Sequence, residues 1–337
     1  MNISYKRKGF FKSVILIFIS GILVITLSNC KTETTFPLRI GSNIWPGYAT
    51  LYLARDLGDY TNTTIKLVDY PSATEVVRAY RHEEIEGVAL TIDEALVLAS
   101  TQDNIRIVAI FNISDGGDVI LGKPEIKTMK DLKGKRVGVE STALGAFFLT
   151  RGLEESGMSL EDIKIVSLEL SEHEKAYQND LVDAIVTFYP PKSKILEMGA
   201  NLLFDSSQIP GEIVDVLVVN TGAIENSPQT IQTLINGHFK GLDYLEKKPQ
   251  EASPIMAKRS QVTPEEFLES LNGLRQPNLQ ENQDLLSKND PSLINAMEKL
   301  VTIMLDNKLL TNTVDIESLL DDRFVQNVTL KDNEHTK

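Results

Sequence analysis

Cysteine is almost absent from this chain of 337 residues, because Cys30 is the single one. A lone cysteine cannot form a disulfide within the chain, so disulfides play no part in the predicted fold. Histidine is scarce too, and the four histidines, His82, His173, His238 and His335, do not stand in HExxH or another metal-ligand spacing. The sequence therefore argues against cysteine catalysis and histidine-based metal sites, and we expect no metal or other cofactor.

Several enzyme motifs and an excess of basic residues are also missing. The sequence contains no G-x-S-x-G, P-loop or G-x-G-x-x-G. Lys and Arg number 34 against 47 Asp and Glu, which gives a net charge of −13. A strongly acidic surface repels the phosphates of nucleic acids, so we expect no nucleic-acid partner. The remaining composition, 42% hydrophobic and 24% charged, is that of a globular protein with room for two domains.

The one long apolar run lies at the N-terminus. Lys6-Arg7-Lys8 precede Val14–Leu27, 14 residues that are too short for a membrane span but typical of a signal peptide. The run ends in Leu27-Ser28-Asn29-Cys30, which resembles a bacterial lipobox in which the cysteine is lipidated. Asn29 departs from that pattern, which usually has Gly, Ala or Ser. We predict a lipoprotein-type signal peptide over residues 1–30, with ordinary cleavage or an uncleaved anchor as alternatives, and a body outside the cytoplasmic membrane.

Strands and helices alternate along the first third of the body. After a polar tether, 31–37, the patterns predict strands at Leu38–Asn43, Thr64–Asp69, Gly87–Leu90 and Ile105–Ile113, and helices at Tyr48–Asp59, Ala73–His82 and Ile92–Ser100. This βαβαβ order predicts an α/β fold with a mostly parallel, doubly wound sheet.

A second α/β unit starts at Ile126. Its predicted strands are Arg136–Val139, Ile163–Leu168, Ala184–Thr187 and Leu202–Phe204, and its predicted helices are Leu144–Ser156, Ser171–Asn179 and Lys192–Met198. Two long apolar strands, Ile105–Ile113 and Ile213–Asn220, bracket this unit. We therefore predict that the chain crosses to a second lobe near Asn112–Asp118 and returns near Pro210–Asp215, so that lobe 1 comprises 38–115 and 216–329 and lobe 2 comprises 116–215.

The rest of the chain is predicted to be helical, followed by a disordered tail at 330–337. Ser227-Pro228 and Asp290-Pro291 are typical helix starts, and Thr263-Pro264-Glu265-Glu266 is a capping box. Pro254 interrupts a helical pattern, so we expect a kink or a restart at Ser253.

Polar and aromatic side chains gather where predicted strands end and helices or crossings begin. Because such loops meet at one edge of a sheet, they form the usual ligand site of α/β proteins. Each residue also has a structural alternative: Trp45 packing a turn, Asp93 as a charge at a helix start, Asp118 in a turn, Glu140 paired with a lysine, Ser141 and Thr142 as helix caps. The candidate ligand-binding residues are Trp45, Tyr48, Thr91, Asp93, Asp118, Glu140, Ser141, Thr142, Tyr189 and Asp215.

Five stretches over residues 38–324 carry a family resemblance: IWPGYATLYLARDLG, LTIDEALVLA, DGGDVILGKPEIKTMKDLKGKRVGVE, VDAIVTFYPPKSKI and FDSSQIPGEIVDVLVV. In this order they resemble periplasmic substrate-binding proteins of nitrate, sulfonate and taurine ABC importers, the NMT1 or thiamine-pyrimidine-synthase-like family. The resemblance implies a two-lobed venus-flytrap fold of type II with mixed sheets and a double-crossover hinge. It also implies ligand contacts at the candidate residues, although Tyr189 stands where related sequences often have an acidic residue.

The same resemblance implies a non-enzymatic function. We expect an extracytoplasmic protein, monomeric and held in the cell envelope by lipidated Cys30, that captures a small solute and delivers it to an ABC permease and its ATPase. A ligand-sensing protein for a membrane signalling partner is the main alternative. An enzyme on the same fold is a further one, but the thiamine-pyrimidine synthases need a cysteine-rich stretch that this chain lacks.

The charge of the ligand is open at this point. A helix N-terminus near Thr142 favours an anion such as sulfonate or nitrate. Four candidate residues, Asp93, Asp118, Glu140 and Asp215, are acidic, and no candidate is basic. Since carboxylates repel anions and hold cations, our hypothesis is a small organic solute with an amine or a ring nitrogen, zwitterionic like taurine or similar to an aminopyrimidine.

Overall fold

The computed structural model describes residues 37–330. The predicted signal peptide, Cys30, nearly all of the tether and most of the predicted tail lie outside these residues. None of the helices between residues 37 and 330 is both long and apolar enough to span a membrane.

Six strands form the first sheet, in the order β11-β4-β10-β3-β1-β2. They are β1 (Leu38–Ser42), β2 (Ile65–Asp69), β3 (Gly87–Thr91), β4 (Ile105–Ser114), β10 (Val214–Asn220) and β11 (Leu274–Arg275). β1 is parallel to β2 and β3, whereas β10 lies antiparallel between β3 and β4. The first four strands therefore share one direction, as predicted, but the returning strand β10 makes the sheet mixed.

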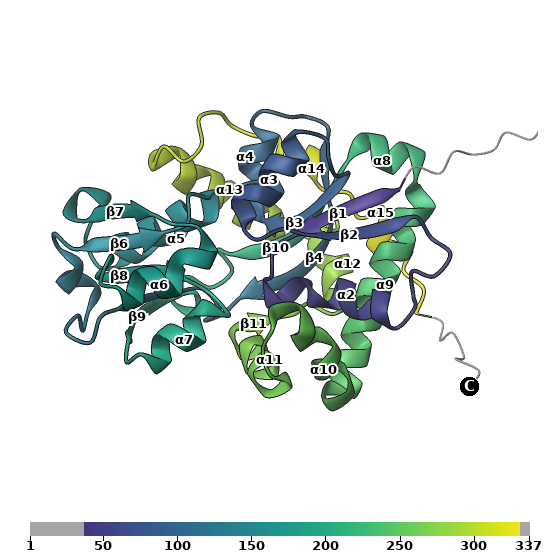
Figure 1. Ribbon diagram of the computed structural model, residues 1–337. Helices are drawn as coiled ribbons and strands as arrows, with labels where there is room; N and C mark the ends of the chain where they lie inside the picture. The colour runs from purple at the N-terminus through teal and green to yellow at the C-terminus, as the bar shows by residue number, and fades with distance from the viewer. Residues whose placement is uncertain (1–36, 331–337) are drawn as a thin grey trace, which may run out of the picture. The chain divides into compact units, whose positions relative to one another are not determined.

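Helices cover this sheet and fix the loops at its edge (Figure 1). They include η1 (Pro46–Tyr48), α2 (Ala49–Asp56), α3 (Ala73–Arg81) and α4 (Ile92–Ala99). β3 is buried at every position and β10 at all but its last, which is why both strands read as continuous apolar runs instead of alternating ones. We call this sheet and its helices the first lobe.

Five strands form the second sheet, in the order β7-β6-β8-β5-β9. They are β5 (Val119–Gly122), β6 (Arg136–Val139), β7 (Lys164–Ser167), β8 (Ala184–Thr187) and β9 (Asn201–Asp205), with helices α5 (Ala143–Glu155), α6 (His173–Gln178) and α7 (Pro191–Glu197). β6 is parallel to β7 and β8, and β5 is antiparallel to β8 and β9. We call this part the second lobe, and Figure 1 shows its sheet beside that of the first.

The chain passes between the two sheets twice. It leaves the first sheet at the end of β4, Ser114, and enters the second at Val119. It leaves the second sheet at Asp205 and re-enters the first at Val214, after the short helix η5 (Ser206–Gln208). This is the two-lobed α/β architecture with two mixed sheets that the resemblance implied. The predicted lobe boundaries at 115/116 and 215/216 stay a prediction, and β10 of the first sheet already includes Val214 and Asp215.

The C-terminal part is helical and packs largely on the first lobe (Figure 1). Thr263 and Glu266 form the predicted capping box, each side chain accepting from the other's N–H. Pro254 lies inside α10 without ending it, so the predicted restart at Ser253 is wrong; only the carbonyl of Gln250, in the first turn, loses its partner. The helices are α8 (Thr221–Asn226), α9 (Pro228–Lys247), α10 (Pro249–Ser260), α11 (Pro264–Ser270), α12 (Leu279–Leu286), α13 (Ser292–Asp306), α14 (Ile316–Leu319) and α15 (Arg323–Gln326).

Candidate functional site

A small cavity lies between the two lobes, and we call it the interlobe cavity. It leaves about 40 Å³ for the centres of water molecules, which is room for a few waters because one needs about 10–15 Å³. The lobes are therefore close together around it. Its lining comprises Asn43, Trp45, Tyr48, Ala73, Thr91, Glu94, Asp118, Glu140, Thr142, Leu144, Gly145, Phe148, His173, Val186, Thr187, Phe188 and Asp215.

Seven of the ten candidate residues predicted from the sequence line this cavity. They come from both lobes and from the first passage between them: Trp45, Tyr48, Thr91, Asp118, Glu140, Thr142 and Asp215. Segments far apart in the sequence thus meet at one place, as loops at the carboxyl ends of strands do in open α/β sheets. Their role in binding a ligand stays a prediction.

Tyr48 and Asp215 form a buried pair from the first lobe. Tyr48 ends η1, just after β1, and Asp215 is the second residue of β10, where it lies opposite Thr91 on β3. The Tyr48 hydroxyl donates to Asp215 Oδ1, while Asp215 Oδ2 has no partner among the described residues. Burial raises the pKa of Asp215 well above its usual range, although the hydrogen bond from Tyr48 opposes this. One acceptor oxygen is therefore left for a ligand.

Asp118 lies at the first passage and is held by a chain of hydrogen bonds. The Ser114 hydroxyl donates to Asp118 Oδ2 at 2.6 Å and is 2.8 Å from the Ser206 hydroxyl, which accepts from the Gly116 N–H at 2.7 Å. Because Ser114 uses its proton on Asp118, the hydroxyl of Ser206 must donate to Ser114. Burial raises the pKa of Asp118 to about 6. The chain links the two passages between the lobes at the cavity.

Glu140 follows β6 in the second lobe and reaches across to the first. Its Oε1 accepts from the N–H of Ala73 at 3.1 Å and from that of Thr74 at 3.5 Å, at the N-terminus of α3. The alternative in which Glu140 pairs with a lysine is wrong, because the unpaired N–H groups and positive dipole end of α3 attract the carboxylate. Burial nevertheless raises its pKa to about 7.

Three candidate residues do not line the interlobe cavity. Asp93, in the first turn of α4, is fully buried, and burial raises its pKa to about 7. Ser141 is exposed, shares a hydrogen bond with Ser167, and lines a neighbouring hollow with Arg78, Arg81 and His82. Tyr189 lines another hollow, beside Lys192 and Trp45. Thr142 caps α5 as predicted, accepting from the Gly145 N–H at 2.9 Å.

Four further lining residues were not among the ten candidate residues. Phe188 contacts Trp45 edge to face at 5.4 Å between ring centroids, and it is the neighbour of the predicted Tyr189. Glu94 follows Asp93, and its Oε1 is buried without a partner among the described residues. His173 binds Thr187 through Nδ1 at 3.0 Å, and burial lowers its pKa to about 4, which leaves it neutral. Phe148, in α5, is buried and contributes an aromatic ring to the lining. The start of α6 is a sequence signal that could have identified His173, whereas position alone does not distinguish Phe188 from Tyr189 or Glu94 from Asp93.

The cavity is acidic and partly aromatic. Four lining side chains are carboxylates, Glu94, Asp118, Glu140 and Asp215, and no lining residue is Lys or Arg. Lys192, which does not line the cavity, donates to the carbonyl oxygen of Gly116 at 2.8 Å, and its charge lowers the pKa of Asp118 less than burial raises it. Within residues 37–330, no three His, Cys, Asp or Glu side chains are close enough to hold a metal ion.

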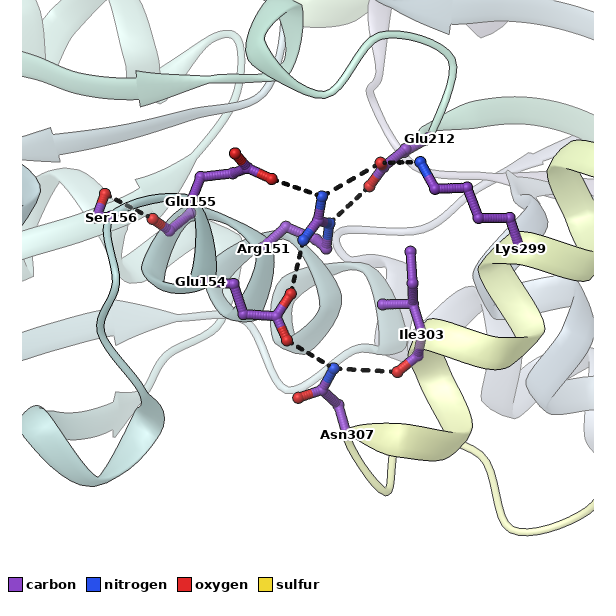
Figure 2. A network of polar contacts seen from close by, with 9 residues as sticks. Arg151, Glu154, Glu155, Ser156, Glu212, Lys299, Ile303 and Asn307 are labelled. Carbon is purple, nitrogen blue, oxygen red and sulfur yellow. Dashed lines mark hydrogen bonds and ion pairs between the residues drawn. The ribbon is translucent and has the colours of Figure 1, made fainter.

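A second polar network joins the lobes away from the cavity, as Figure 2 shows. Arg151 on α5 binds Glu212, in the second passage, through Nε at 2.7 Å, and it also binds Glu154 and Glu155 on its own helix. Lys299 on α13 binds Glu212 at 3.0 Å, and Asn307 donates to Glu154 at 2.9 Å. Burial alone would raise the pKa of Glu212, but these cations hold it below its usual value. The network ties the second lobe to a C-terminal helix.

Solved structures share this fold at low sequence identity. The ligand-binding component of an ABC-type import system from Staphylococcus aureus has a TM-score of 0.72 and 13% identity, covering 87% of this chain and 99% of that one. The alkanesulfonate-binding protein SsuA of Xanthomonas axonopodis pv. citri, bound to MOPS, has a TM-score of 0.68 and 19% identity, covering 82% and 95%. The desulfurization enzyme DSZB has a TM-score of 0.64 and 15% identity, covering 86% and 98%. The fold therefore occurs in binding proteins and in an enzyme.

Sequence comparisons identify the family. A Brucella abortus (strain 2308) protein described as a binding protein is 25% identical over 161 residues, 45% of this chain and 49% of its own length. The chain thus spans about half the length of the curated relatives it matches. The model of a family described as NMT1/THI5 like matches residues 45–252, more than half of the chain, and contains most of the cavity lining. The protein therefore belongs to the NMT1/THI5-like family.

Proposed function

We propose that the protein is the solute-binding component of an ABC importer and that it captures a small organic nitrogen or sulfur compound in the interlobe cavity. The solute is taurine- or sulfonate-like, or aminopyrimidine-like. The single observation that supports this most strongly is the cavity itself, because aromatic and polar side chains from both lobes line one space, which holds a few waters with the lobes this close together. Two lobes joined by two chain passages open and close readily around such a site.

Delivery to a membrane permease follows from this proposal. A closed, loaded form presents both lobes in one fixed arrangement, which a permease can distinguish from the open, empty form. We propose a periplasmic or cell-envelope location, with Cys30 as the lipid-bearing residue and the protein acting as a monomer. The intact mass of the mature protein, with Cys30→Ala as control, tests the anchor.

The direct test is to identify the solute that co-purifies. The protein is purified natively, denatured, and the released small molecules are analysed by mass spectrometry, followed by calorimetric titration of each candidate into the refolded protein. We expect one compound at close to one molecule per chain, with binding lost in Trp45→Ala. Absence of any co-purified solute, together with no binding of taurine, alkanesulfonates, nitrate or aminopyrimidines, would refute the proposal.

Two other functions fit the same cavity. A sensor would bind the same solute but hand its closed form to a membrane signalling protein, so uptake of the labelled solute by cells lacking the protein would stay normal. An enzyme is favoured only by the shared fold of DSZB. A chemical change in the co-purified solute during incubation with the protein would support that alternative.

A further inference from the structure

The interlobe cavity has an excess of buried acidic groups. Glu94, Asp118, Glu140 and Asp215 line it with only 2–6% of their surface exposed, and Asp93 is fully buried. No described lysine or arginine lines it. A buried carboxylate is costly unless a positive group or hydrogen-bond donors compensate it. A positively charged ligand would therefore bind strongly in the cavity.

Three of these carboxylates have oxygens without a hydrogen-bond partner among the described residues: Asp93 has two, but it does not line the cavity, whereas Glu94 and Asp215 line it and have one each. Tyr48 occupies Asp215 Oδ1, but Asp215 Oδ2 has no partner. The Thr91 N–H occupies Glu94 Oε2 at 3.2 Å, but Glu94 Oε1 has no partner. Buried acceptors in native proteins are almost always paired, so these two mark where donor groups of a ligand belong. Both residues line the same cavity, which places two acceptors within one binding space.

The side chains that line the cavity determine which kind of positively charged group it can bind. No three acidic or other ligating side chains of the described residues are close enough to share a metal ion. Trp45, Tyr48, Phe148 and Phe188 give the cavity aromatic surfaces, which attract organic cations through their faces and cover flat apolar bodies. These features favour an organic cation with N–H groups over an inorganic one.

Features that could hold an anion are weaker. The N-terminus of α5 faces the cavity through Thr142 and Gly145, but the Thr142 side chain already accepts from the Gly145 N–H. Arg78, Arg81 and His82 line the neighbouring hollow, which Glu94 and Thr142 line as well, and water and salt screen them there. None of these basic residues forms a hydrogen bond or ion pair with Glu94 Oε1, which has no partner among the described residues.

We propose that the ligand is a small organic cation of the amidinium class, whose N–H groups donate to Asp215 Oδ2 and Glu94 Oε1. The cavity rejects bare oxyanions such as nitrate and alkanesulfonates. This inference rests on the proposed function, because it assigns the charge of the solute that the cavity captures. It separates this chain from the alkanesulfonate-binding proteins that share its fold.

Two sets of compounds with matched shapes test the charge. The first is acetamidinium, acetamide and acetate, and the second is benzamidinium, benzamide and benzoate, each titrated calorimetrically into the protein at pH 7.5. We expect the cation to bind at least tenfold more tightly than its neutral and anionic partners in at least one set. Asp215→Asn and Glu94→Gln should each weaken the cation at least tenfold. Asp243→Asn removes the same charge from the exposed surface of α9 and should change binding less than twofold.

The outcomes separate the inference from the proposed function. Tighter binding of an anion than of its matched cation overturns the inference, and so does cation binding that both Asp215→Asn and Glu94→Gln leave within twofold. No binding by any of the six compounds also overturns it. In each of these cases a co-purified neutral or anionic solute would leave the proposed function standing. Thermal unfolding of each variant shows whether it is folded before its binding is compared.

Discussion

Replacing Asp118 by Asn tests whether a buried carboxylate destabilises the protein when no cation is bound in the cavity. Asp118 is buried, and its pKa is raised from 3.8 to about 6. A carboxyl whose folded pKa is raised binds more protons in the folded than in the unfolded state between these two values. The free energy of unfolding that it contributes is complete below pH 3.8 and is lost as the pH rises through about 6. The empty protein should therefore lose stability at this site on going from acid to neutral pH.

The size of the effect follows from the two pKa values. Because the folded and unfolded pKa values differ by about two units, ionisation of Asp118 lowers the free energy of unfolding by about 3 kcal/mol at pH 7.5. At pH 5, where Asp118 is still mostly protonated in the folded protein, it lowers the free energy of unfolding by about 1.5 kcal/mol. The amide that replaces the carboxyl in Asp118→Asn cannot ionise, but it keeps an oxygen that accepts from the Ser114 hydroxyl, as Asp118 does at 2.6 Å. Asp118→Asn should thus stabilise the empty protein more at pH 7.5 than at pH 5.

Thermal unfolding measures this difference directly. An unfolding entropy of about 2.1 cal/mol/K per residue gives about 0.6 kcal/mol/K for a chain of this size, so Asp118→Asn should raise Tm by about 5 °C at pH 7.5 and about half as much at pH 5. Asp243→Asn, on the exposed surface of α9, should change Tm by less than 1 °C at both pH values. A Tm shift for Asp118→Asn that is equal at the two pH values, or a lower Tm at pH 7.5, would refute the reasoning.

Three further substitutions test contacts around the cavity and between the lobes. Arg151→Met should lower the free energy of unfolding by about 2–3 kcal/mol, since it removes the main partner of half-buried Glu212, and Arg151→Lys should recover part of it in denaturant titrations. Glu140→Ala should cost about 1 kcal/mol by uncapping α3, whereas Glu140→Gln, which keeps the acceptor oxygen, should cost less than half of that by the same measurement; equal losses would argue against capping. Tyr48→Phe should lower the free energy of unfolding by about 1–3 kcal/mol in the same titrations, because it leaves the buried Asp215 Oδ1 without its donor; a loss below about 0.3 kcal/mol would contradict this.

The local rules predicted the parts of the site that depend on nearby sequence. Thr142 caps α5 because a hydroxyl before a helical stripe accepts an unpaired N–H, and this contact needs only three residues. The two long apolar strands, β4 and β10, were recognisable because strands that are buried on both faces lack alternation. The positions of these two strands in the chain predicted where the chain passes between the lobes.

The features of the site that the sequence did not predict depend on contacts between the lobes and on the packing of single helices and turns. Glu140 binds the start of α3, 67 residues earlier, and no local pattern pairs a residue after β6 with a helix in the other lobe. The choice between Phe188 and Tyr189 depends on how the chain turns after β8, and a shift of one residue moves the side chain from one hollow to another. Glu94 was missed for the same reason, because Asp93 and Glu94 adjoin in α4 and only the packing of that helix decides which one lines the cavity.

Similarity of fold does not determine the charge of the ligand, because that charge depends on the side chains at the site. The same fold occurs in an alkanesulfonate-binding protein that is 19% identical in sequence. A ligand's charge is set by a few side chains at the site, and here Glu94 and Asp215 each leave a buried acceptor oxygen unpaired. A sulfonate brought to them would add a third acceptor where two donors are missing, whereas an amidinium would supply both donors and the compensating charge. On our proposal, the charge of the bound solute is therefore set by the acidic side chains Glu94 and Asp215 and not by the fold.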